Sequence, residues 1–506
     1  MKNITLYRSP LIEMLESKNQ DTPILFYNNS SYTISDILHN AKNIAVNLKK
    51  LGFKEGDKAV LLAEPNIDFI STLYAIIMCK GVTAIIDPEM GNSLYLNRLN
   101  QFKPKWLFID FRLVLLQKYN WLRMIYKAIK SNSFYIPSID NVRYVIMGKK
   151  NIFKSKINLY NLKANANTSI DWEISKLKQD FLVTYTSGTL AKPKGVVHSD
   201  YSLVNSLKLL ANKISKYKDE NMVSYLPHFA LIGIMANVKV FLWSKGLNAS
   251  KRIKFLNKYN INIFFGPPVE INELIEYCKQ NNLEFPTSLN YILLGSAPIY
   301  KPFLKKLKNV TKAKVECLYG MTENLLVSHI TAEEKLEYKG TGDIVGNPFK
   351  GVNMKISDEG EICIKSNQLF SNYLYRKNEN EYHQTGDLGF IDKQGRIVLI
   401  GRKKNMIIRK EYNIYPGLYE PIINSIPQVQ QAVMVGKYNN TKSDEDIYLI
   451  VQKESEISEG KLRKLLKSDK YGIDYSALPD KIIFVKIPRK GRQQKIDYSA
   501  LYNLLK

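Results

Sequence analysis

The sequence is poor in the residues that mark several protein classes. Its 506 residues include only four cysteines, Cys79, Cys278, Cys317 and Cys363, which stand far apart without a CxxC pair. That spacing argues against a disulfide framework and a zinc site, and it favours a reducing, cytoplasmic setting. The longest apolar run, FISTLYAIIMC, ends at Lys80, well short of a bilayer span, and the start MKNITLYRSPLIEML lacks the apolar core of a signal peptide. We therefore expect no transmembrane segment.

Acidic residues are scarce relative to basic ones. The 73 lysines and arginines outnumber the 47 aspartates and glutamates and give a formal net charge of +26. Nucleic acid and anionic membranes are the usual partners of such a charge. Here, however, the lysines are dispersed, and there is no Cys/His finger spacing, no aromatic RNA-binding signature and no basic-region heptad. We favour a global compositional bias and expect no nucleic-acid partner, although small polyanionic ligands would be attracted to this surface.

What is abundant is a succession of apolar, strand-like runs. They read KAVLLAE, VTAIID, KWLFID, VRYVIMG, FLVTYTS, NIFFGPP, LNYILLGS and KVECLYG. Stretches with helical periodicity, such as DFISTLYAIIMCKG and INELIEYCKQNN, lie between several of them. This alternation predicts a large α/β region with buried parallel strands.

The pattern of apolar and turn residues changes twice towards the end of the chain. From about Gly346, short β segments with turn signals follow one another, as in VNMKISDEGEICIKS and GDLGFIDKQGRIVLIGR. The segments QAVMVGK, IYLIVQK and KIIFVKIP, around KLRKLLKSD, indicate a small α+β domain at the C-terminus. We predict a large domain over residues 1–401 and a small one over 402–506, with a hinge near Lys404.

One insertion, QKYNWLRMIYKAIKSNSFY at residues 117–135, is both basic and aromatic. Two interpretations remain open. It could lie on a membrane surface as an interfacial helix, which would make the protein a peripheral membrane partner. The interpretation that we favour is an exposed loop and helix whose aromatic residues are buried.

The stretch YTSGTLAKPKGVVHS, Tyr185 to Ser199, has the chemistry of a phosphate cradle. It combines hydroxyl groups, a glycine that lets backbone N–H groups approach a ligand, and fixed positive charges. The hydroxyl groups belong to Thr186, Ser187 and Thr189, and to Thr184 just before the stretch. The glycine is Gly188, and the positive charges are those of Lys192 and Lys194. The pattern is not GxxxxGK[ST], so it is not the P-loop of that class of nucleotidases. Taken alone, it would also fit an ordinary polar surface turn.

Further segments recur with it in a characteristic order: LPHFALIG, GSAPIY, YGMTE, TGDLGFID, GRKKNMII and PRKGRQQKI. Together they resemble the adenylate-forming superfamily, which comprises acyl- and aryl-CoA synthetases, luciferases and peptide-synthetase adenylation domains. The resemblance runs from SYTISDILHN near the start almost to the C-terminus. It implies an α/β fold with parallel-rich sheets and a β-rich section in a large N-terminal domain, followed by a small mobile α+β domain. The cofactors that it implies are ATP, Mg²⁺ and, for thioester-forming members, coenzyme A.

The resemblance also assigns roles for phosphate chemistry. A carboxylate attacks the α-phosphorus of ATP in this family, so negative charge must be neutralised by donors, a lysine and a metal ion. The phosphate loop would be Thr186, Ser187, Gly188 and Thr189, with Lys194 at the leaving phosphates. Thr322 would bind phosphate, Glu323 would hold Mg²⁺ as a hard oxygen ligand, and Lys495 would be the catalytic lysine of the small domain.

Adenosine and acyl contacts follow in the same way. The adenine pocket would be lined by Gly295, Ser296, Ala297, Pro298, Tyr319 and Gly320. Asp387 would take the ribose hydroxyls with Arg402 beside it, and His228 and Phe229 would line the acyl pocket. The remaining histidines show no metal spacing, so packing or surface roles are expected for His39, His198, His329 and His383.

Several positions depart from the family pattern. Leu190 and Ala191 replace a usual Thr-Gly pair, and Glu411 stands where thioester-forming members have a glycine beside the pantetheine tunnel. The catalytic-lysine motif has no glycine before Lys495 and a longer spacing, so Lys490 and Arg492 remain substitutes for that lysine.

We interpret the chain as an ATP-dependent enzyme that converts a carboxylic acid to acyl-AMP and then to a CoA thioester. The phrases IIDPEMG and PHFALIG resemble the branch of fatty-acid activating enzymes and β-lactone synthetases, which favours a fatty acid as the substrate. One alternative is an acyl-AMP ligase or a β-lactone synthetase-type enzyme that does not use CoA. Another is a nucleotide-binding protein without catalysis.

Overall fold

The computed structural model describes most of the chain. The described residues are 3–86, 92–130, 141–148, 157–166, 168–174, 178–185, 194–224, 227–243, 247–377, 380–409, 412–441, 444–468, 470–490 and 494–505. They form two compact units. The first unit comprises Met1–Phe265, Thr322–Leu325 and Asn367–Glu379, and the second comprises Gly266–Met321, Leu326–Ser366 and Asn380–Lys506. The predicted domain boundary after residue 401 stays a prediction.

In the first unit, the described residues form a nine-stranded sheet in the order β22-β21-β11-β10-β5-β4-β6-β7-β8. Its strands are β22 (Arg376–Lys377), β21 (Asn372–Tyr373), β11 (Gly195–Ser199), β10 (Asp180–Tyr185), β5 (Val82–Ile85), β4 (Lys58–Leu62), β6 (Trp106–Asp110), β7 (Arg143–Met147) and β8 (Ile157–Asn158). The strands from β10 to β8 pair in parallel, whereas β10 and β11 are antiparallel. The predicted mixed α/β fold with buried parallel strands is confirmed.

Other strands of this unit follow the order β14-β12-β13-β2-β3, and β1 (Ile4–Tyr7) pairs with β9 (Ile170–Glu173). The bounds are β14 (Ile263–Gly266), β12 (Asn221–Ser224), β13 (Lys239–Leu242), β2 (Leu25–Tyr27) and β3 (Ser30–Tyr32). The helices are α1 (Pro10–Glu16), α2 (Ile34–Lys50), α3 (Ile67–Met78), α4 (Asn92–Phe102), α5 (Phe111–Lys118), α6 (Asn120–Lys130), α7 (Leu159–Leu162), α8 (Asp200–Ile214), α9 (Pro227–Ala236) and α10 (Ala249–Lys258).

Local sequence explains why α2 starts and stops where it does. The Thr33 side chain accepts from the Asp36 backbone and the Asp36 side chain accepts from the Thr33 backbone, which is a capping box. The helix ends at Lys50, and Gly52 just after it has a φ of +88°, a left-handed conformation that favours glycine. Between these ends, the apolar side chains fall on one buried face.

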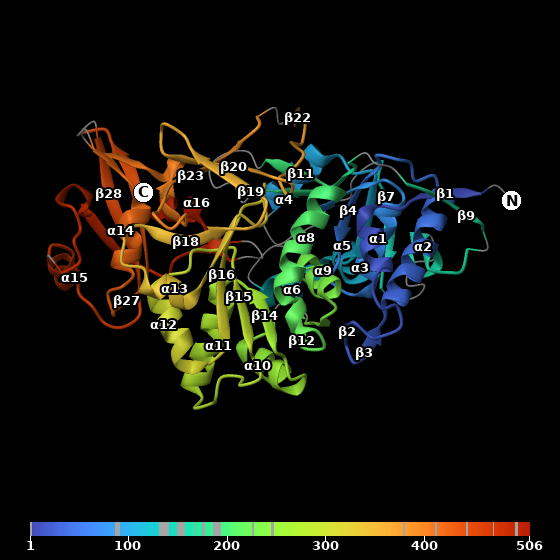
Figure 1. Ribbon diagram of the computed structural model, residues 1–506, viewed down its shortest axis with the longest axis horizontal. Coiled ribbons are helices and arrows are strands. Elements are labelled where there is room, and N and C mark those ends of the chain that lie inside the picture. The colour runs from blue at the N-terminus through green and yellow to red at the C-terminus, as the bar shows by residue number, and fades with distance from the viewer. Residues whose placement is uncertain are drawn as a thin grey trace. The chain divides into compact units, whose positions relative to one another are not determined.

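In the second unit, the described strands follow the order β15-β16-β17-β18-β24-β23-β20-β19. They are β15 (Tyr291–Leu294), β16 (Lys314–Tyr319), β17 (Ser328–Thr331), β18 (Asp343–Pro348), β24 (Ile397–Arg402), β23 (His383–Ile391), β20 (Glu361–Ser366) and β19 (Val352–Ile356). Its helices before residue 402 are α11 (Pro268–Gln280), α12 (Lys301–Val310) and α13 (Ala332–Glu337), and α11 and α12 lie side by side (Figure 1). The antiparallel strands from β18 to β24 confirm the short β segments that were predicted from about Gly346.

The C-terminal hundred residues have apolar cores of their own. Two buried clusters draw only on residues 407–505, one centred on Ile447 and Leu449 and the other on Val433 and Ile450. The elements are β25 (Ile407–Arg409), β26 (Tyr412–Ile414), α14 (Pro416–Ile423), β27 (Val429–Asn439), β28 (Asp444–Lys453), α15 (Glu459–Leu466), β29 (Lys481–Phe484), β30 (Arg489–Lys490), β31 (Lys495–Ile496) and α16 (Tyr498–Leu504). These cores are what an independently packed C-terminal domain requires.

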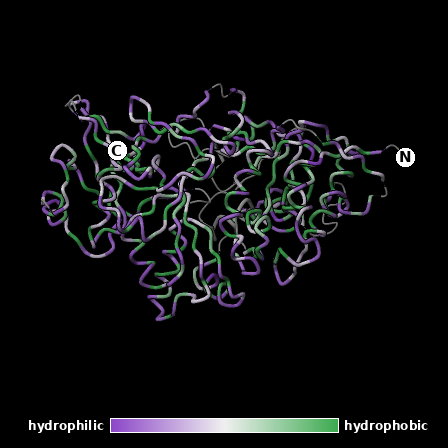
Figure 2. The backbone as a smooth tube through the Cα atoms, viewed as in Figure 1, coloured by the Kyte–Doolittle hydropathy of each residue, from purple (hydrophilic) through white to green (hydrophobic). Residues whose placement is uncertain are grey.

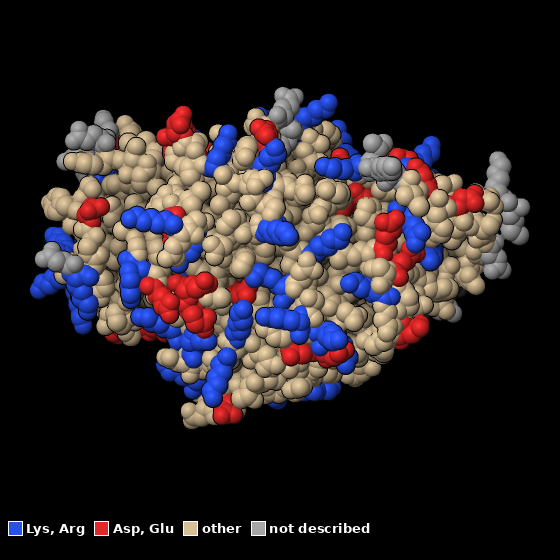
Figure 3. All heavy atoms as spheres, in the orientation of Figure 1, with Lys and Arg blue, Asp and Glu red and all other residues tan. Residues whose placement is uncertain are grey.

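Hydropathy and charge are distributed as in a globular protein. Figure 2 shows hydrophobic residues along the strands and hydrophilic ones along the peripheral loops and turns. In Figure 3, lysines and arginines are scattered over the visible face with acidic groups among them, and no continuous basic stripe crosses it. In the part of the chain that the structure describes, no helix has the length and apolar character needed to span a bilayer.

The favoured interpretation of the insertion at residues 117–135 is wrong in one respect. A helix, α6, forms as expected, but Trp121, the aromatic residue of α6 whose side chain is described, is 59% exposed. Met124 and Ile125 are exposed as well, at 72% and 50%. The physical reason is that α6 packs chiefly on the neighbouring helix α5, so its outer face has no cover from the described residues.

Glu420 in α14 makes the stability of the C-terminal region depend on pH. Burial raises the pKa of its carboxyl group to about 7, although the Met434 backbone N–H donates to it at 2.9 Å. The folded protein therefore retains a proton that the unfolded chain loses near pH 4.5, so stability falls as the pH rises from about 4.5 to 7.

We expect Glu420→Gln to remove this pH dependence, because the amide oxygen can still accept the Met434 N–H. At pH 8 the variant should be more stable than the parent by about 3 kcal/mol, and near pH 4.5 the two should agree. Urea unfolding at both pH values measures the difference. Glu456→Gln, which alters a 96% exposed side chain, is the matched control. Equal stabilities of Glu420→Gln and the parent at pH 8 would contradict the assignment.

Candidate active site

The predicted phosphate loop joins two antiparallel strands of the first unit. Strand β10 ends at Tyr185, which pairs with Gly195 at the start of β11. Residues 186–193 between them, including Thr186, Ser187, Gly188 and Thr189, lie outside the described residues. The structure therefore fixes the two ends of the loop and describes Lys194 at its exit.

Lys194 and Glu323 lie close to the same side chain, Tyr373 of β21. The Lys194 Nζ atom lies over the Tyr373 ring, 5.2 Å from its centroid, and the Tyr373 hydroxyl donates to Glu323 Oε1 at 3.0 Å. Burial and the Glu323 carboxylate raise the pKa of Tyr373 above its usual range, so the hydroxyl keeps its proton. Lys194, which was predicted to bind phosphate, and Glu323, which was predicted to bind the metal ion, therefore both contact the Tyr373 side chain.

Backbone pairing explains how Tyr373 reaches this place. Strand β21 pairs antiparallel with β11, with Tyr373 opposite Val196, and the Leu374 N–H donates to the Gly195 carbonyl at 2.7 Å. The Phe370 N–H donates to the Glu323 carbonyl at 2.8 Å, which fixes the backbone of Glu323 as well. Sequence analysis missed Tyr373, because this strand lies nearly 180 residues after β11 in the chain.

His198 of β11 holds the next predicted residue, Thr322. The His198 side chain is 1% exposed, and its ring hydrogen-bonds to the Thr322 backbone, while its Nε2 atom has no hydrogen-bond partner among the described residues. Burial lowers the pKa of His198 to about 4, so the ring is neutral at pH 7. The packing role expected for His198 is therefore specific: it anchors the backbone beside Glu323.

In the second unit, three motifs converge on Asp387. Its carboxylate pairs with Arg402, and its Oδ2 atom accepts the Tyr319 hydroxyl at 2.6 Å. Asp387 is only 4% exposed, and burial raises its pKa against the opposing effects of Arg402 and Tyr319. Burial and this carboxylate also raise the pKa of Tyr319 well above its usual value. Strands β16, β23 and β24 therefore bring together three of the residues that were predicted to bind adenosine.

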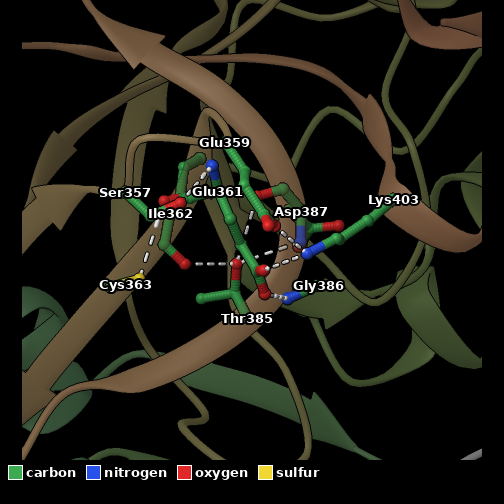
Figure 4. A network of polar contacts seen from close by, with 9 residues as sticks. All are labelled: Ser357, Glu359, Glu361, Ile362, Cys363, Thr385, Gly386, Asp387 and Lys403. Atoms are coloured by element: carbon green, nitrogen blue, oxygen red, sulfur yellow. Dashed lines mark hydrogen bonds and ion pairs between the residues drawn. The ribbon is translucent and has the colours of Figure 1, made fainter. Parts of the chain in front are cut away.

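Figure 4 shows the polar network that shapes the Thr385-Gly386-Asp387 turn. Glu361 accepts the Gly386 N–H at 2.9 Å, and the Thr385 hydroxyl donates to the Ile362 carbonyl at 2.8 Å. Gly386 has a φ of +74°, a conformation that a residue with a side chain rarely adopts. These hydrogen bonds fix the backbone of the turn, which holds Asp387 in one orientation.

The same network reaches the predicted hinge. Lys403, in the short helical turn Lys403–Asn405 that follows β24, pairs with Glu359 and lies 3.4 Å from Glu361. Lys404 sits in this turn as well. The residue predicted as the hinge therefore follows directly on the strand that carries Arg402.

The predicted adenine segment Gly295 to Pro298 follows β15 as an irregular turn. Gly295 is buried, and its N–H donates to the Gly266 carbonyl at 3.2 Å. Ser296 has a φ of +70°, which is uncommon for a residue other than glycine and is typical of constrained sites. Ala297 is half-buried, and Gly320 and Pro298 are exposed.

Lys495 lies on a small hairpin near the C-terminus. Strands β30 and β31 pair so that Lys490 stands opposite Lys495, and Lys490 forms an ion pair with Asp497 at 3.0 Å. Gln494 has a φ of +50°, so the position before Lys495 adopts the conformation that glycine favours although it carries a side chain. Arg492, the other substitute, lies outside the described residues.

The predicted acyl-pocket residues His228 and Phe229 belong to the first turn of α9, and their side chains lie outside the described part. Glu411 is also outside the described residues. Arg409, two residues before Glu411, forms an ion pair with Asp480 at 2.8 Å and donates to the Leu478 carbonyl.

The donor set fits a magnesium ion that binds with its nucleotide. Among the described residues, no group of three or more His, Cys, Asp or Glu side chains is arranged to hold a metal ion. Mg²⁺ is usually bound by one or two carboxylates together with substrate phosphates and water. Glu323, a half-buried carboxylate close to the phosphate-loop exit, suits that mode of binding.

Comparisons with known proteins identify a matching family and similar structures. The model of the AMP-binding enzyme family matches residues 13–374. A 2-succinylbenzoate–CoA ligase from Oceanobacillus iheyensis is 24% identical over 501 residues, covering 94% of this chain and 95% of its own length. A mitochondrial medium-chain acyl-CoA ligase from Bos taurus is 26% identical over 333 residues, covering 60% of this chain and 54% of its own. The O-succinylbenzoate CoA synthetase of Bacillus subtilis, solved with ATP and magnesium, has a similar fold, with a TM-score of 0.76, 20% identity and coverage of 97% and 98%.

Proposed function

Because the chain belongs to the AMP-binding enzyme family, we propose that it activates a carboxylic acid with ATP and then transfers the acyl group to coenzyme A. The observation that carries the proposal is the convergence on Asp387. A buried carboxylate is costly unless it is paired, and here Arg402 and the Tyr319 hydroxyl both engage it. Tyr319 lies 68 residues before Asp387 in the chain and Arg402 lies opposite Asp387 on the neighbouring strand, and this convergence supports a nucleoside site.

In the proposed first step, a carboxylate oxygen of the acid attacks the α-phosphorus of ATP and pyrophosphate leaves, which gives acyl-AMP. Asp387 would accept hydrogen bonds from the ribose hydroxyls. Lys194 would bind the leaving phosphates, and Thr322 would donate to them. Magnesium, held by Glu323 and the phosphates, would neutralise part of the developing charge. Lys495 would bridge the carboxylate and the α-phosphate.

In the second step, the thiol of coenzyme A would lose its proton to water and its sulfur would attack the acyl carbon. AMP would leave with the electron pair of the broken carbon–oxygen bond. A fatty acid is the substrate that we propose, on the likeness of the PHFALIG and IIDPEMG segments to fatty-acid activating enzymes. Supporting this choice, the described part of α9 is almost entirely apolar. The Glu411 departure leaves open the alternative of an acyl-AMP enzyme with another acceptor.

The test is ATP–pyrophosphate exchange with a panel of fatty, aromatic and dicarboxylic acids, followed by thioester formation with CoA. We expect exchange with fatty acids and transfer to CoA. Exchange without transfer would favour the alternative acceptor. Nucleotide binding without exchange for any acid would overturn the proposal in favour of a binding protein that lacks catalysis.

Tyr373 provides a prediction about positioning. Tyr373→Phe removes the hydroxyl that donates to Glu323 and retains the ring that lies under Lys194. A hydrogen bond to a charged group contributes about 1.5 kcal/mol or more, so we expect pyrophosphate release to slow about tenfold. The Mg²⁺ concentration that gives half-maximal rate should rise, because Glu323 loses its orientation.

The matched control is Tyr375→Phe, which removes a hydroxyl that donates to the Gln101 carbonyl rather than to Glu323. It should leave both the rate and the Mg²⁺ dependence unchanged. If the two variants behave alike, Tyr373 does not position the metal ligand.

A further inference from the structure

Helix α6 presents an apolar face that no described element covers. Trp121, Met124 and Ile125 are spaced three and four residues apart, so they share one side of the helix. Their exposed fractions, 59%, 72% and 50%, are among the largest of the apolar side chains in the described part of the chain. We refer to these three residues as the α6 face.

The stretch of sequence that contains the α6 face carries charge of one sign. Between Phe111 and Ile139 the sequence contains five basic residues and no acidic residue. They are Arg112, Lys118, Arg123, Lys127 and Lys130. Arg112 forms an ion pair with Asp110 at 2.8 Å, and the other four basic residues lie in α6 or at the last residue of α5 along the chain.

Helix α10 of the same unit shows that this combination is not general. It is also basic, with Lys251, Lys254 and Lys258, but its apolar residues Ile253 and Leu256 are buried. Basic residues and exposed apolar side chains therefore occur together in α6. In α10, basic residues occur with buried apolar side chains instead.

An anionic lipid surface fits both properties of α6. Transfer of exposed tryptophan, methionine and isoleucine side chains to the acyl-chain boundary lowers the free energy. Lysines and arginines of the same helix are attracted to anionic headgroups. A nucleic acid would use the charge but not Met124 or Ile125. A second copy of this chain would bring like charges together, which opposes association through this face.

We propose that the α6 face inserts into the interface of bilayers that contain anionic phospholipids, with α6 parallel to the membrane plane. The binding is peripheral and reversible, because the inserted surface consists of three side chains on one short helix. Binding through this face is independent of which acid the enzyme activates.

The test measures partition of the full-length protein onto vesicles of phosphatidylcholine with and without phosphatidylglycerol. We expect binding to the anionic vesicles, weakened by salt and by omission of phosphatidylglycerol. Trp121→Ser combined with Met124→Ser should reduce the partition coefficient at least about tenfold. Lys127→Gln combined with Lys130→Gln should reduce binding to anionic vesicles only.

Two control variants match these changes. Tyr475→Ser removes an 87% exposed aromatic side chain in the other unit, and Lys251→Gln with Lys254→Gln removes two charges from α10. Both should bind like the parent. Trp121→Phe keeps most of the apolar surface, so it should still bind but should lose the quenching of tryptophan fluorescence by brominated lipid.

Three results would overturn the proposal. The first is absence of binding of the parent protein to anionic vesicles. The second is equal binding of the parent and the Trp121→Ser, Met124→Ser variant. The third is a dimer in lipid-free solution that this variant abolishes, which would identify a second copy of the chain as the occupant of the α6 face.

Discussion

Replacing Lys495 with alanine is expected to slow acyl-AMP formation at least about 100-fold, because it removes a positive charge from the attacking and leaving oxygens in the transition state. Transfer of the acyl group from supplied acyl-AMP to a thiol should stay close to the parent rate, since the adenylation charges no longer develop in that step. The two half-reactions are measured separately, by pyrophosphate release and by thioester formation. A loss confined to the first would identify Lys495 as an adenylation residue.

Lys490→Ala is the matched control for this experiment. Lys490 stands opposite Lys495 on the same hairpin, and its ion pair with Asp497 already engages its charge. We therefore expect only a small change in adenylation from this variant. If Lys490→Ala abolishes adenylation and Lys495→Ala does not, the motif is shifted and Lys490 is the catalytic lysine.

The hairpin also shows what a motif comparison overlooks. The absence of a glycine before Lys495 counted against its assignment, but Gln494 adopts a φ of +50°. The backbone conformation that glycine would permit is thus present at a cost that the hairpin must offset, of the order of 1 kcal/mol. The sequence reports residue types, whereas the site depends on backbone conformation.

Local features of the fold were predictable, and pairings across long stretches of chain were not. Runs such as KWLFID and KVECLYG become β6 and β16 because their apolar pattern determines burial within a few residues. Tyr373 gave no such signal. Its proposed role follows from the pairing of β21 with β11, and the site that it joins was predicted from the phosphate loop, Lys194, Thr322 and Glu323.

Burial was the other property that sequence could not decide. His198 and Trp121 both had plausible packing roles, yet His198 is 1% exposed and Trp121 is 59% exposed. The difference depends on which elements pack above each residue. For His198 these include the segment that carries Thr322, and for Trp121 no described element fills the place.

Glu323→Gln and Lys194→Ala are each expected to slow pyrophosphate release about 100-fold, because each removes an interaction of about 3 kcal/mol with charge that develops in the transition state. The two losses should differ in their dependence on magnesium. Glutamine is a weaker ligand for a hard cation than carboxylate, so higher Mg²⁺ concentrations should partly restore the rate of Glu323→Gln. Lys194→Ala should show no such recovery, since its role is to bind phosphate directly.

The common contact with Tyr373 makes the pair a sharper test than either change alone. If Lys194 and Glu323 act on one Mg·ATP through the same tyrosine, the double variant should lose less than the product of the two single losses, because interactions within one network are not additive. Glu381→Gln, at a 70% exposed side chain paired with Lys365, controls for the loss of one negative charge and should leave exchange unchanged. Unchanged exchange rates in both single variants would show that these residues do not form the phosphate site. If the loss in the double variant equals the product of the two single losses, Lys194 and Glu323 act at two independent sites.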